Sequence, residues 1–519
     1  MELSLVIVIL VSLAAPAISG YPLAVIKPWC AQTLHPELCE HFFTRTSKFG
    51  DNPVHNKSEF LNMSLQIILD RAINATENAI RLEPKCRDRI EKAAWRDCVN
   101  FYKETLNVLN KMGDPKRFTP SNVQKWLSTT LTNLQTCEQG FLDFNITLMP
   151  SILDVVLKNL TINALALNSG ACGGHNNSWI NYDQHGFPTW ITTSERRLLQ
   201  SWNPTGWANL VVAKDGSGDY TTVQDAINAA SQRPETDRFV IYVKAGIYKE
   251  YLQIESSDIF MVGDGIGQTI ITGNRFNGDQ DGTITTATSA TVTVKGERFV
   301  ARFMTFRNTA GPENGQAVAF YSASDYSTIY QCSFEGFQDT LYVYDGRQFF
   351  RECHIYGTVD FIMGDATVVF QRCTIHARKP LGNQNTITAQ SRDHYLKCSG
   401  MSFHNCFVVM APDLEPFVDS VKTYLGRPWR AYARVVFLSS FLDRLIHPQG
   451  WLRWECRLDK LYYGEYLNEG PGSSTDQRVR WPGYHVITDY NEASAFTVRQ
   501  FISGDYWLPE ALVPYDSDI

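Results

Sequence analysis

Apolar residues recur every three or four positions through four segments between about residues 58 and 168. This spacing puts the apolar side chains of each segment on one side of a helix, where they can be buried together. Pro84, Pro115, Pro120 and Pro150 fall between the segments, as expected where proline ends a helix. The pattern therefore predicts an all-α four-helix bundle in the amino-terminal third.

From Leu210 onward the pattern changes to short apolar runs rich in β-branched and aromatic residues, such as FVIYVKAGIY, ARFMTFRN and TVVFQRC. Helical periodicity is almost confined to residues 223–230, VQDAINAA. We therefore expect a predominantly β domain here.

A repeat narrows the architecture of this β domain. Similar stretches begin around Cys332, Cys353 and Cys373, at intervals of 21 and 20 residues. A period near 20 suits one coil of a β-solenoid, in which equivalent positions stack at the strand spacing of about 4.8 Å.

The repeat brings two carboxylates into the same phase. Asp339 and Asp360 each lie seven residues after a repeat cysteine, so stacked coils would place them side by side. Two neighbouring carboxylates resist double ionisation, which supplies one proton donor and one anion near neutral pH. Two solvated turn aspartates are the alternative, and the matching phase favours the pair.

Other candidate site residues lie around these aspartates. Amide groups can donate to an oxyanion, arginine can hold a carboxylate, and aromatic rings can pack on sugars. Gln338 and Asp339 are adjacent, so on a regular strand they would face opposite sides, and their joint participation requires a turn or bulge. The candidates are Gln316, Gln338, Arg427, Trp429, Trp451 and Trp454.

The 12 cysteines suit an oxidising compartment. Cys30 and Cys39 lie close together in sequence, and Cys98 and Cys137 could link the second and third helical segments. Cys353 and Cys373 fall on successive coils, where spacing allows either a disulfide or a ladder of buried thiols.

Export and processing signals surround the helical part. Residues 1–20 are an apolar run ending in small residues, which predicts a cleaved signal peptide rather than a membrane anchor, although no basic residue precedes the run. Six Asn-x-Ser/Thr sequons all precede residue 180: Asn56, Asn62, Asn74, Asn145, Asn159 and Asn176. Residues 171–207 form a predicted linker that contains Arg196 and Arg197, either a protease site or a solvated charge pair.

Length and charge set the remaining bounds. A chain of 519 residues has room for two or more domains, and 47 basic against 54 acidic residues leave a formal charge of -7. This balance gives no footprint for nucleic acid. We divide the chain into a signal peptide (1–20), a helical region (21–170), a linker (171–207) and a β domain (208–519).

Five ordered motifs in the β domain resemble those of plant pectinesterases: GIYKE at 246–250, QAVA at 316–319, QDTL at 338–341, DFIMG at 360–364 and LGRPW at 425–429. The resemblance runs from about Asn209 to the carboxyl end and includes WPGYH at 481–485. The helical region resembles the inhibitor-like pro-region that precedes many of these enzymes. Met363, where the family usually has Phe, and Cys456, in a shortened segment, are departures.

The resemblance implies a right-handed parallel β-helix that hydrolyses methyl esters of pectin, in the cell wall, without metal or organic cofactor. It makes Asp360 the nucleophile and Asp339 the acid and base, with Gln316 and Gln338 stabilising the oxyanion and Arg427 orienting Asp360. It implies that the substrate contacts are Thr286, Gln316, Arg427, Trp429 and Trp451. It also favours a Cys353–Cys373 disulfide and cleavage of the chain after Arg196 and Arg197.

The implied partners are pectin, a processing protease and a separate pectinesterase-inhibitor protein, and the chain is expected to be a secreted monomer. Three rival functions remain. A retaining glycosidase also uses carboxyl groups about 5 Å apart. A pectate lyase would need an acidic calcium cluster, and the sequence offers no convincing one. A silent wall-binding or inhibitory module would not require the full set of five catalytic candidates.

Overall fold

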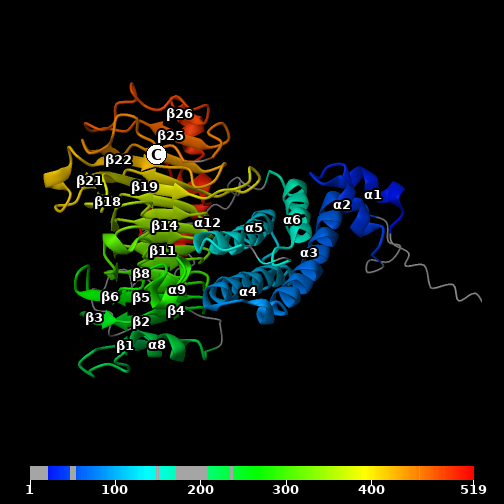
Figure 1. Ribbon diagram of the computed structural model, residues 1–519, viewed down its shortest axis with the longest axis horizontal. Coiled ribbons are helices and arrows are strands. Elements are labelled where there is room, and N and C mark those ends of the chain that lie inside the picture. Colours follow the sequence, from blue (N-terminus) through cyan, green and yellow to red (C-terminus); the bar gives the residue numbers. More distant parts are fainter. Residues whose placement is uncertain are drawn as a thin grey trace, which may run out of the picture.

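The computed structural model describes residues 21–46, 54–147, 149, 151–170, 208–233, 238–454 and 456–519. The predicted signal peptide, Asn176, and the predicted linker with Arg196 and Arg197 lie outside these ranges. The described chain forms a helical domain beside a solenoid of strands (Figure 1).

The helical domain confirms the predicted bundle. Its four long helices are α3 (Lys57–Ile80), α4 (Arg89–Asn110), α5 (Pro120–Asp143) and α6 (Val155–Leu167), preceded by the short α1 (Leu23–Cys30) and α2 (Pro36–Phe43). Each long helix begins at a side chain that accepts a hydrogen bond from a backbone N–H three residues later, which satisfies a donor that the helix itself leaves free. These capping residues are Asn56, Asp88, Thr119 and Asp154.

Disulfides Cys30–Cys39 and Cys98–Cys137 stabilise this domain. The second joins α4 to α5, as their positions in the sequence suggested. Asn56, Asn62, Asn74 and Asn145 have exposed side chains and Asn159 is half-buried, so the surface offers room for the glycans that the sequons predict.

The solenoid is built from three parallel sheets that the chain visits in turn. The eleven-stranded sheet contains β1 (Leu210–Val212), β2 (Phe239–Val243), β5 (Ile259–Gly263), β8 (Val300–Arg302), β11 (Ser327–Tyr330), β14 (Arg347–Arg351), β17 (Thr367–Gln371), β20 (Gly400–His404), β23 (Arg434–Leu438), β25 (Tyr462–Tyr466) and β26 (Tyr484–Val486).

The eight-stranded sheet contains β3 (Gly246–Lys249), β6 (Thr269–Gly273), β9 (Thr305–Asn308), β12 (Ser333–Glu335), β15 (His354–Gly357), β18 (Thr374–Ala377), β21 (Phe407–Met410) and β24 (Phe441–Leu442). The seven-stranded sheet contains β4 (Leu252–Ile254), β7 (Val292–Val294), β10 (Phe320–Ser322), β13 (Leu341–Val343), β16 (Ile362–Gly364), β19 (Gln384–Gln390) and β22 (Lys422–Gly426). This is a right-handed parallel β-helix, as expected.

The register confirms the repeat. Ser333 pairs with His354, and His354 with Thr374, which are the offsets of 21 and 20 residues seen in the sequence. Buried phenylalanines stack along the interior in the same way, with centroids 5.0 Å apart for Phe350 and Phe370 and 4.7 Å for Phe370 and Phe403. Equivalent inward positions on successive coils therefore fill one continuous core.

Short helices complete the β domain. The predicted helix at 223–230 is α8 (Val223–Ala230), which covers the first coil. Three helices near the carboxyl end, which the periodicity did not reveal, are α10 (Tyr490–Ser494), α11 (Val498–Phe501) and α12 (Gly504–Ala511). The remaining single turns are α9 (Asp279–Gly282), η1 (Glu83–Lys85), η2 (Lys111–Gly113), η4 (Ala287–Ser289), η5 (Pro312–Asn314) and η6 (Glu415–Phe417).

The expected Cys353–Cys373 disulfide is wrong. Both residues are free, fully buried thiols, and Cys332 and Cys406 extend the same column on the neighbouring coils. A column of small apolar thiols packs in the core without a covalent link. Of the two readings that spacing allowed, the structure has the thiol ladder.

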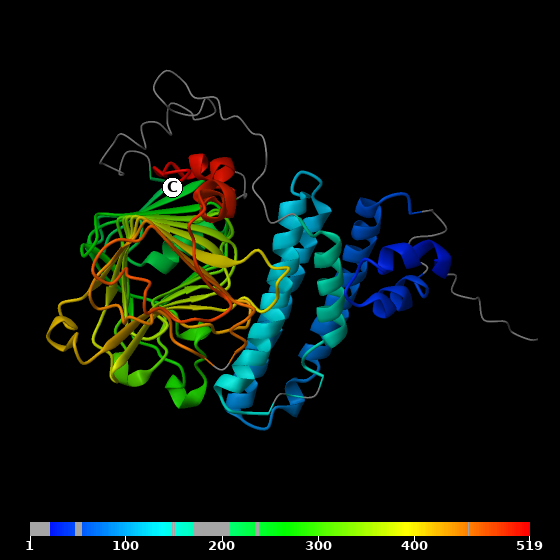
Figure 2. The same cartoon turned by 90° about the horizontal axis from the view of Figure 1, so that it is seen from above.

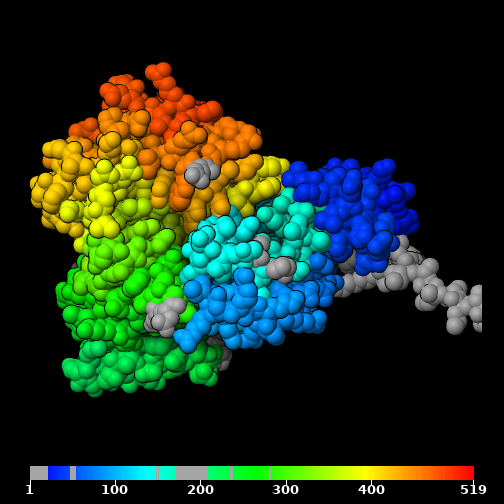
Figure 3. Space-filling model, in the orientation of Figure 1, coloured from blue at the N-terminus to red at the C-terminus, as the bar shows by residue number. Residues whose placement is uncertain are grey.

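The helical domain lies against one face of the solenoid. Figures 1 and 2 agree that α4 and α5 are the helices next to the strands, while α1 and α2 lie farthest away. The space-filling view shows these helices directly against the middle coils (Figure 3). Among the described residues no helix is long and apolar enough to cross a bilayer.

Candidate active site

Asp339 and Asp360 lie beside each other, because Leu341 pairs with Ile362 in the seven-stranded sheet, the same offset of 21 residues. Each aspartate immediately precedes its strand and has a left-handed backbone, with φ of 60° at Asp339 and 51° at Asp360. Such angles are unusual for a residue with a side chain and mark functional turns. Both side chains are buried, at 7% and 5% exposure.

The turn at Asp339 resolves the problem of two adjacent site residues. Gln338 and Asp339 line the same pocket, because the left-handed backbone at Asp339 breaks the alternation of a strand. Gln338 also pairs with Gln316 as a parallel bridge between successive coils. Both amide side chains therefore lie at the pocket beside the two carboxylates.

Asp360 is held by three donors. Arg427, just after β22, donates from Nε to Oδ1 over 2.8 Å and from Nη2 to Oδ2 over 2.6 Å. Thr386 in β19 donates from Oγ1 to Oδ1 over 2.6 Å and accepts from the Asp360 backbone N–H at 2.9 Å. Charge-assisted donors of this kind favour the ionised carboxylate.

Asp339 has the opposite electrostatics. Burial raises the pKa of its carboxyl well above the usual range, and the neighbouring charge of Asp360 raises it further, against the lowering effect of Arg427. Asp339 is therefore the member of the pair that keeps its proton, while Asp360 is held as the anion.

The pocket has a volume of about 180 Å³. Its aromatic wall is formed by Trp429 and Trp454, and the guanidinium of Arg427 stacks 3.9 Å from the centre of the Trp454 ring. Thr286 and Met363 also line it. Within the described residues no group of three His, Cys, Asp or Glu side chains is arranged to hold a metal ion.

Trp451 does not contact the pocket, contrary to expectation. It is 1% exposed, stacks on Tyr463 with centroids 4.1 Å apart, and donates its indole N–H to Glu465 over 3.2 Å. Trp451 therefore belongs to the core, and Trp454 supplies the second aromatic surface. The two lie three residues apart in an irregular segment, where no periodicity indicates which faces inward.

Two helices of the helical domain close the other side of the pocket. Asp97 and Phe101 come from α4, and Gln139, Gly140 and Asp143 from α5. The hydroxyl of Thr285 donates to Asp97 over 2.6 Å, and Arg430 donates to Gln139. Nothing in the sequence pointed to these contacts, since these residues lie on helices whose polar faces look like solvated surface.

Ion pairs hold the helices in place around the pocket. Lys111 contacts Glu297 at 2.5 Å, Arg117 binds the same carboxylate, and Lys125 contacts Asp345 at 2.6 Å. The side chains of Glu297 and Asp345 are buried beneath the helical domain. The described structure is therefore a closed arrangement in which two carboxylates, two amides and an arginine share a pocket beneath α4 and α5.

Stacked carboxylates on a parallel β-helix, one protonated and one fixed as an anion, define a β-helix hydrolase of the acid and nucleophile type. Comparison with known proteins agrees. Residues 209–505 match the family described as Pectinesterase, and residues 24–167 match the family described as Plant invertase/pectin methylesterase inhibitor.

Two relatives are similar over almost their whole length. "Probable pectinesterase/pectinesterase inhibitor 17" of Arabidopsis thaliana is 48% identical, over 99% of this chain and 98% of the relative. "Pectinesterase 2" of Citrus sinensis is 47% identical over 100% of both chains. The solved "Pectin methylesterase from Carrot" has a TM-score of 0.58 and 44% identity, covering 60% of this chain and 98% of its own.

The chain belongs to the pectinesterase family. It is a carboxylic ester hydrolase that carries an inhibitor-like helical domain in the same polypeptide.

Proposed function

We propose that the β domain hydrolyses the methyl esters of pectin with Asp360 as nucleophile and Asp339 as acid and base. The relative position of the two carboxyl groups carries the proposal: Asp360 is gripped as an anion by Arg427 and Thr386, and Asp339 lies on the preceding coil with a raised pKa.

The reaction has two halves. Asp360 attacks the ester carbonyl carbon, and the negative charge on the carbonyl oxygen is stabilised by the amide donors of Gln316 and Gln338. Asp339 donates its proton to the departing methoxide, which leaves as methanol, and an acyl-enzyme anhydride remains on Asp360. Asp339, now ionised, takes a proton from water, and the resulting attack restores Asp360 and releases the acid.

Trp429 and Trp454 offer flat surfaces for the sugar rings of the substrate, and Thr286 lies at the opposite side of the same pocket. Arg427 contributes twice, because it fixes the orientation of Asp360 and keeps it ionised. A glycosidase would need its acid to reach a glycosidic oxygen, and the family match favours the ester.

We also propose that the helical domain blocks the polymer from this site in the intact chain. A pocket of about 180 Å³ walled by α4 and α5 has no room for a polysaccharide to pass through. Secretion, cleavage at Arg196 and Arg197, and binding of a separate inhibitor protein to the exposed β domain remain part of this proposal.

Parallel assay of methanol and of new reducing ends from highly methyl-esterified pectin tests the activity. The protein is a fragment of residues 208–519, compared with its Asp360→Asn variant. Asp419→Asn is the matched control, because the Asp419 side chain is 97% exposed and pairs only with the surface residue Arg444.

We expect methanol without chain cleavage from the wild-type fragment and from the control, and loss of methanol in Asp360→Asn. Reducing ends without methanol would instead establish the glycosidase. A folded fragment that releases neither would contradict the enzyme assignment.

A further inference from the structure

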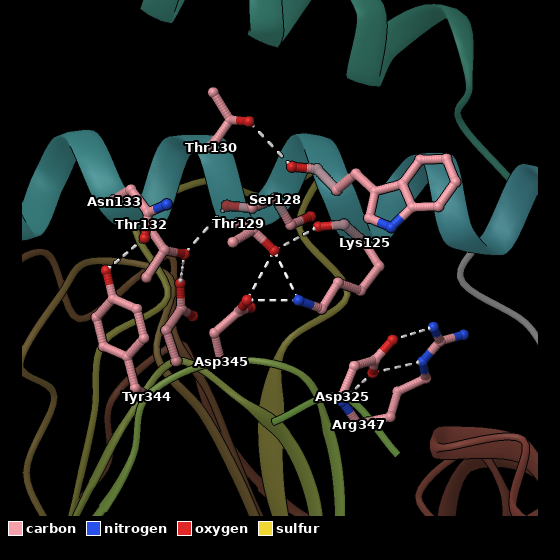
Figure 4. Close-up of polar contacts among 12 residues, drawn as sticks. Lys125, Ser128, Thr129, Thr130, Thr132, Asn133, Asp325, Tyr344, Asp345 and Arg347 are labelled. Carbon is pink, nitrogen blue, oxygen red and sulfur yellow. Dashed lines mark hydrogen bonds and ion pairs between the residues drawn. The ribbon is translucent and has the colours of Figure 1, made fainter. Parts of the chain in front are cut away.

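Hydroxyl and amide groups of α5 occupy polar groups of the β domain next to the pocket. The hydroxyl of Thr129 donates to Asp345 over 2.7 Å. One turn further along, the hydroxyl of Thr132 donates to Asp365 over 2.8 Å, and the Asn133 amide oxygen accepts from the Tyr344 hydroxyl over 2.7 Å (Figure 4).

These contacts continue the active-site pocket without a break. Tyr342 lines the pocket, and Tyr344 lies two residues further along the same strand direction, so both side chains face the helical domain. On α5, Gly140 lies at the pocket and Thr129 lies on Asp345. The 11 residues between them span about 16 Å of helix. We call this strip of Tyr344, Asp345 and Asp365 the α5 track.

The chemistry of the track matches a carbohydrate. Threonine hydroxyls on α5 donate to carboxylate oxygens much as sugar hydroxyls do, and Phe101 of α4 stacks on Tyr344 with centroids 5.8 Å apart, as a sugar ring could. A polymer that left the catalytic pocket in this direction would find the same acceptors once the helices are absent.

Charge distinguishes Asp345 from its neighbours. Asp365 is neutralised by Lys397, and Asp325 by Arg347, and both cations belong to the β domain itself. Asp345 instead pairs with Lys125 of α5 at 2.6 Å. A β domain without its helical partner therefore presents Asp345 on the track without this counterion.

We propose that the α5 track is a substrate subsite, and that Asp345 makes it selective for methyl-esterified, uncharged sugar units over de-esterified ones. The proposal rests on the esterase function proposed above and adds its preferred substrate pattern. An ionised sugar carboxylate on the track would be repelled by Asp345, whereas the hydroxyls of an esterified unit would donate to it.

The fragment of residues 208–519 is suited to the test. It contains its own buried core, and the solved carrot enzyme aligns over 98% of its chain with only 60% of this one, so the β-helix exists as an independent fold. The substrates are oligomers with every unit esterified and the same oligomers partly de-esterified at random.

The measured quantity is the ratio of kcat/KM for the fully esterified over the partly de-esterified oligomers, followed by methanol release. Asp345→Asn should lower this ratio by about 5- to 10-fold, because one like charge is removed from a partly hydrated groove. Asp345→Lys should lower it further. Asp419→Asn, which removes the same charge from an exposed site, should leave it unchanged.

An unchanged ratio in folded Asp345→Asn and Asp345→Lys overturns the inference, while absence of methanol from the wild-type fragment overturns the proposed function instead. A second measurement needs no variant: oligomers that carry one free carboxylate at a known position. In the wild-type fragment, at least one position flanking the reacting ester should reduce kcat/KM about tenfold, and equal rates at every position would contradict the selectivity.

Discussion

Arg427 holds Asp360 through two parallel hydrogen bonds, from Nε to Oδ1 over 2.8 Å and from Nη2 to Oδ2 over 2.6 Å. Its guanidinium is itself packed on the Trp454 ring. The bidentate geometry fixes the plane of the carboxylate as well as its charge, which a single ammonium group cannot do.

Arg427→Lys in the fragment of residues 208–519 should therefore reduce kcat by about 100-fold, a loss of about 2.7 kcal/mol. Arg427→Gln should in addition move the acidic limb of the pH profile to higher pH, because loss of the cation raises the pKa of Asp360. Methanol release against pH measures both. Arg444→Lys, a surface arginine beside Asp419, is the control, and equal kcat values for Arg427→Lys and wild type would refute the orienting role.

Asp339 should be protonated in the intact chain at a pH where ordinary aspartates are ionised. Difference infrared spectroscopy should show a protonated carboxyl band near pH 6 that is absent from Asp339→Asn. The pKa is raised, so the proton is lost only as the pH rises through that higher value.

Asp360→Asn offers an internal check on the cause. Removing the neighbouring charge should lower the pKa of Asp339, so its carboxyl band should disappear at a lower pH than in the wild type. A band that titrates at the same pH in both proteins would show that the pair is not coupled.

The arrangement of Asp339 and Asp360 was predictable because inward and outward positions of a solenoid must recur with the coil, and the cysteine spacing revealed that period. Thr386 was not, although it binds Asp360, because it lies 26 residues later, outside the period of 20 or 21. Trp451 and Trp454 could not be separated for a similar reason, since they lie in a segment without regular structure.

The closure by the helical domain was also beyond the sequence. Lys125 and Thr129 lie on the polar side of an amphipathic helix, which is ordinarily solvated. Their burial against Asp345 depends on complementarity between two separately folded surfaces, and no spacing within either domain encodes it.

The thiol ladder leads to a chemical prediction. Alkylation of the unfolded protein without reductant should label Cys353 and Cys373, while Cys98 and Cys137 should react only after reduction. Peptide mass spectrometry distinguishes the two outcomes. Recovery of a Cys353–Cys373 linked peptide would contradict the structure.

Replacement of a ladder cysteine should act through packing alone. Cys353→Ala removes a fully buried sulfur, and the cavity should lower the free energy of unfolding by about 1–2 kcal/mol. Cys373→Ala should cost a similar amount, measured by denaturant titration. A disulfide would instead make both substitutions equivalent to loss of a cross-link, and the double variant no worse than either single one.

Docking of the helical domain should weaken as the pH rises. Burial at the interface raises the pKa of Asp97 to about 6, against the lowering effect of the hydrogen bond from Thr285 and the charges of Arg96 and Lys295. The ordinary value for aspartate is about 3.9, so the docked form binds this proton more tightly than the separated form does. The resulting stabilisation is complete below about pH 4 and is lost as the pH rises to about 6.

Inhibition of the fragment of residues 208–519 by a separately produced helical domain (residues 21–170) measures this effect. The inhibition constant should rise by at most about 100-fold between pH 4 and pH 6.5. Asp97→Asn keeps a hydrogen-bond acceptor for Thr285 but cannot ionise, so its inhibition constant should vary less across the same range. Asp70→Asn, on α3 away from the pocket, is the matched control and should follow the wild type. A wild-type inhibition constant that does not change with pH would show that protonation of Asp97 contributes nothing to docking.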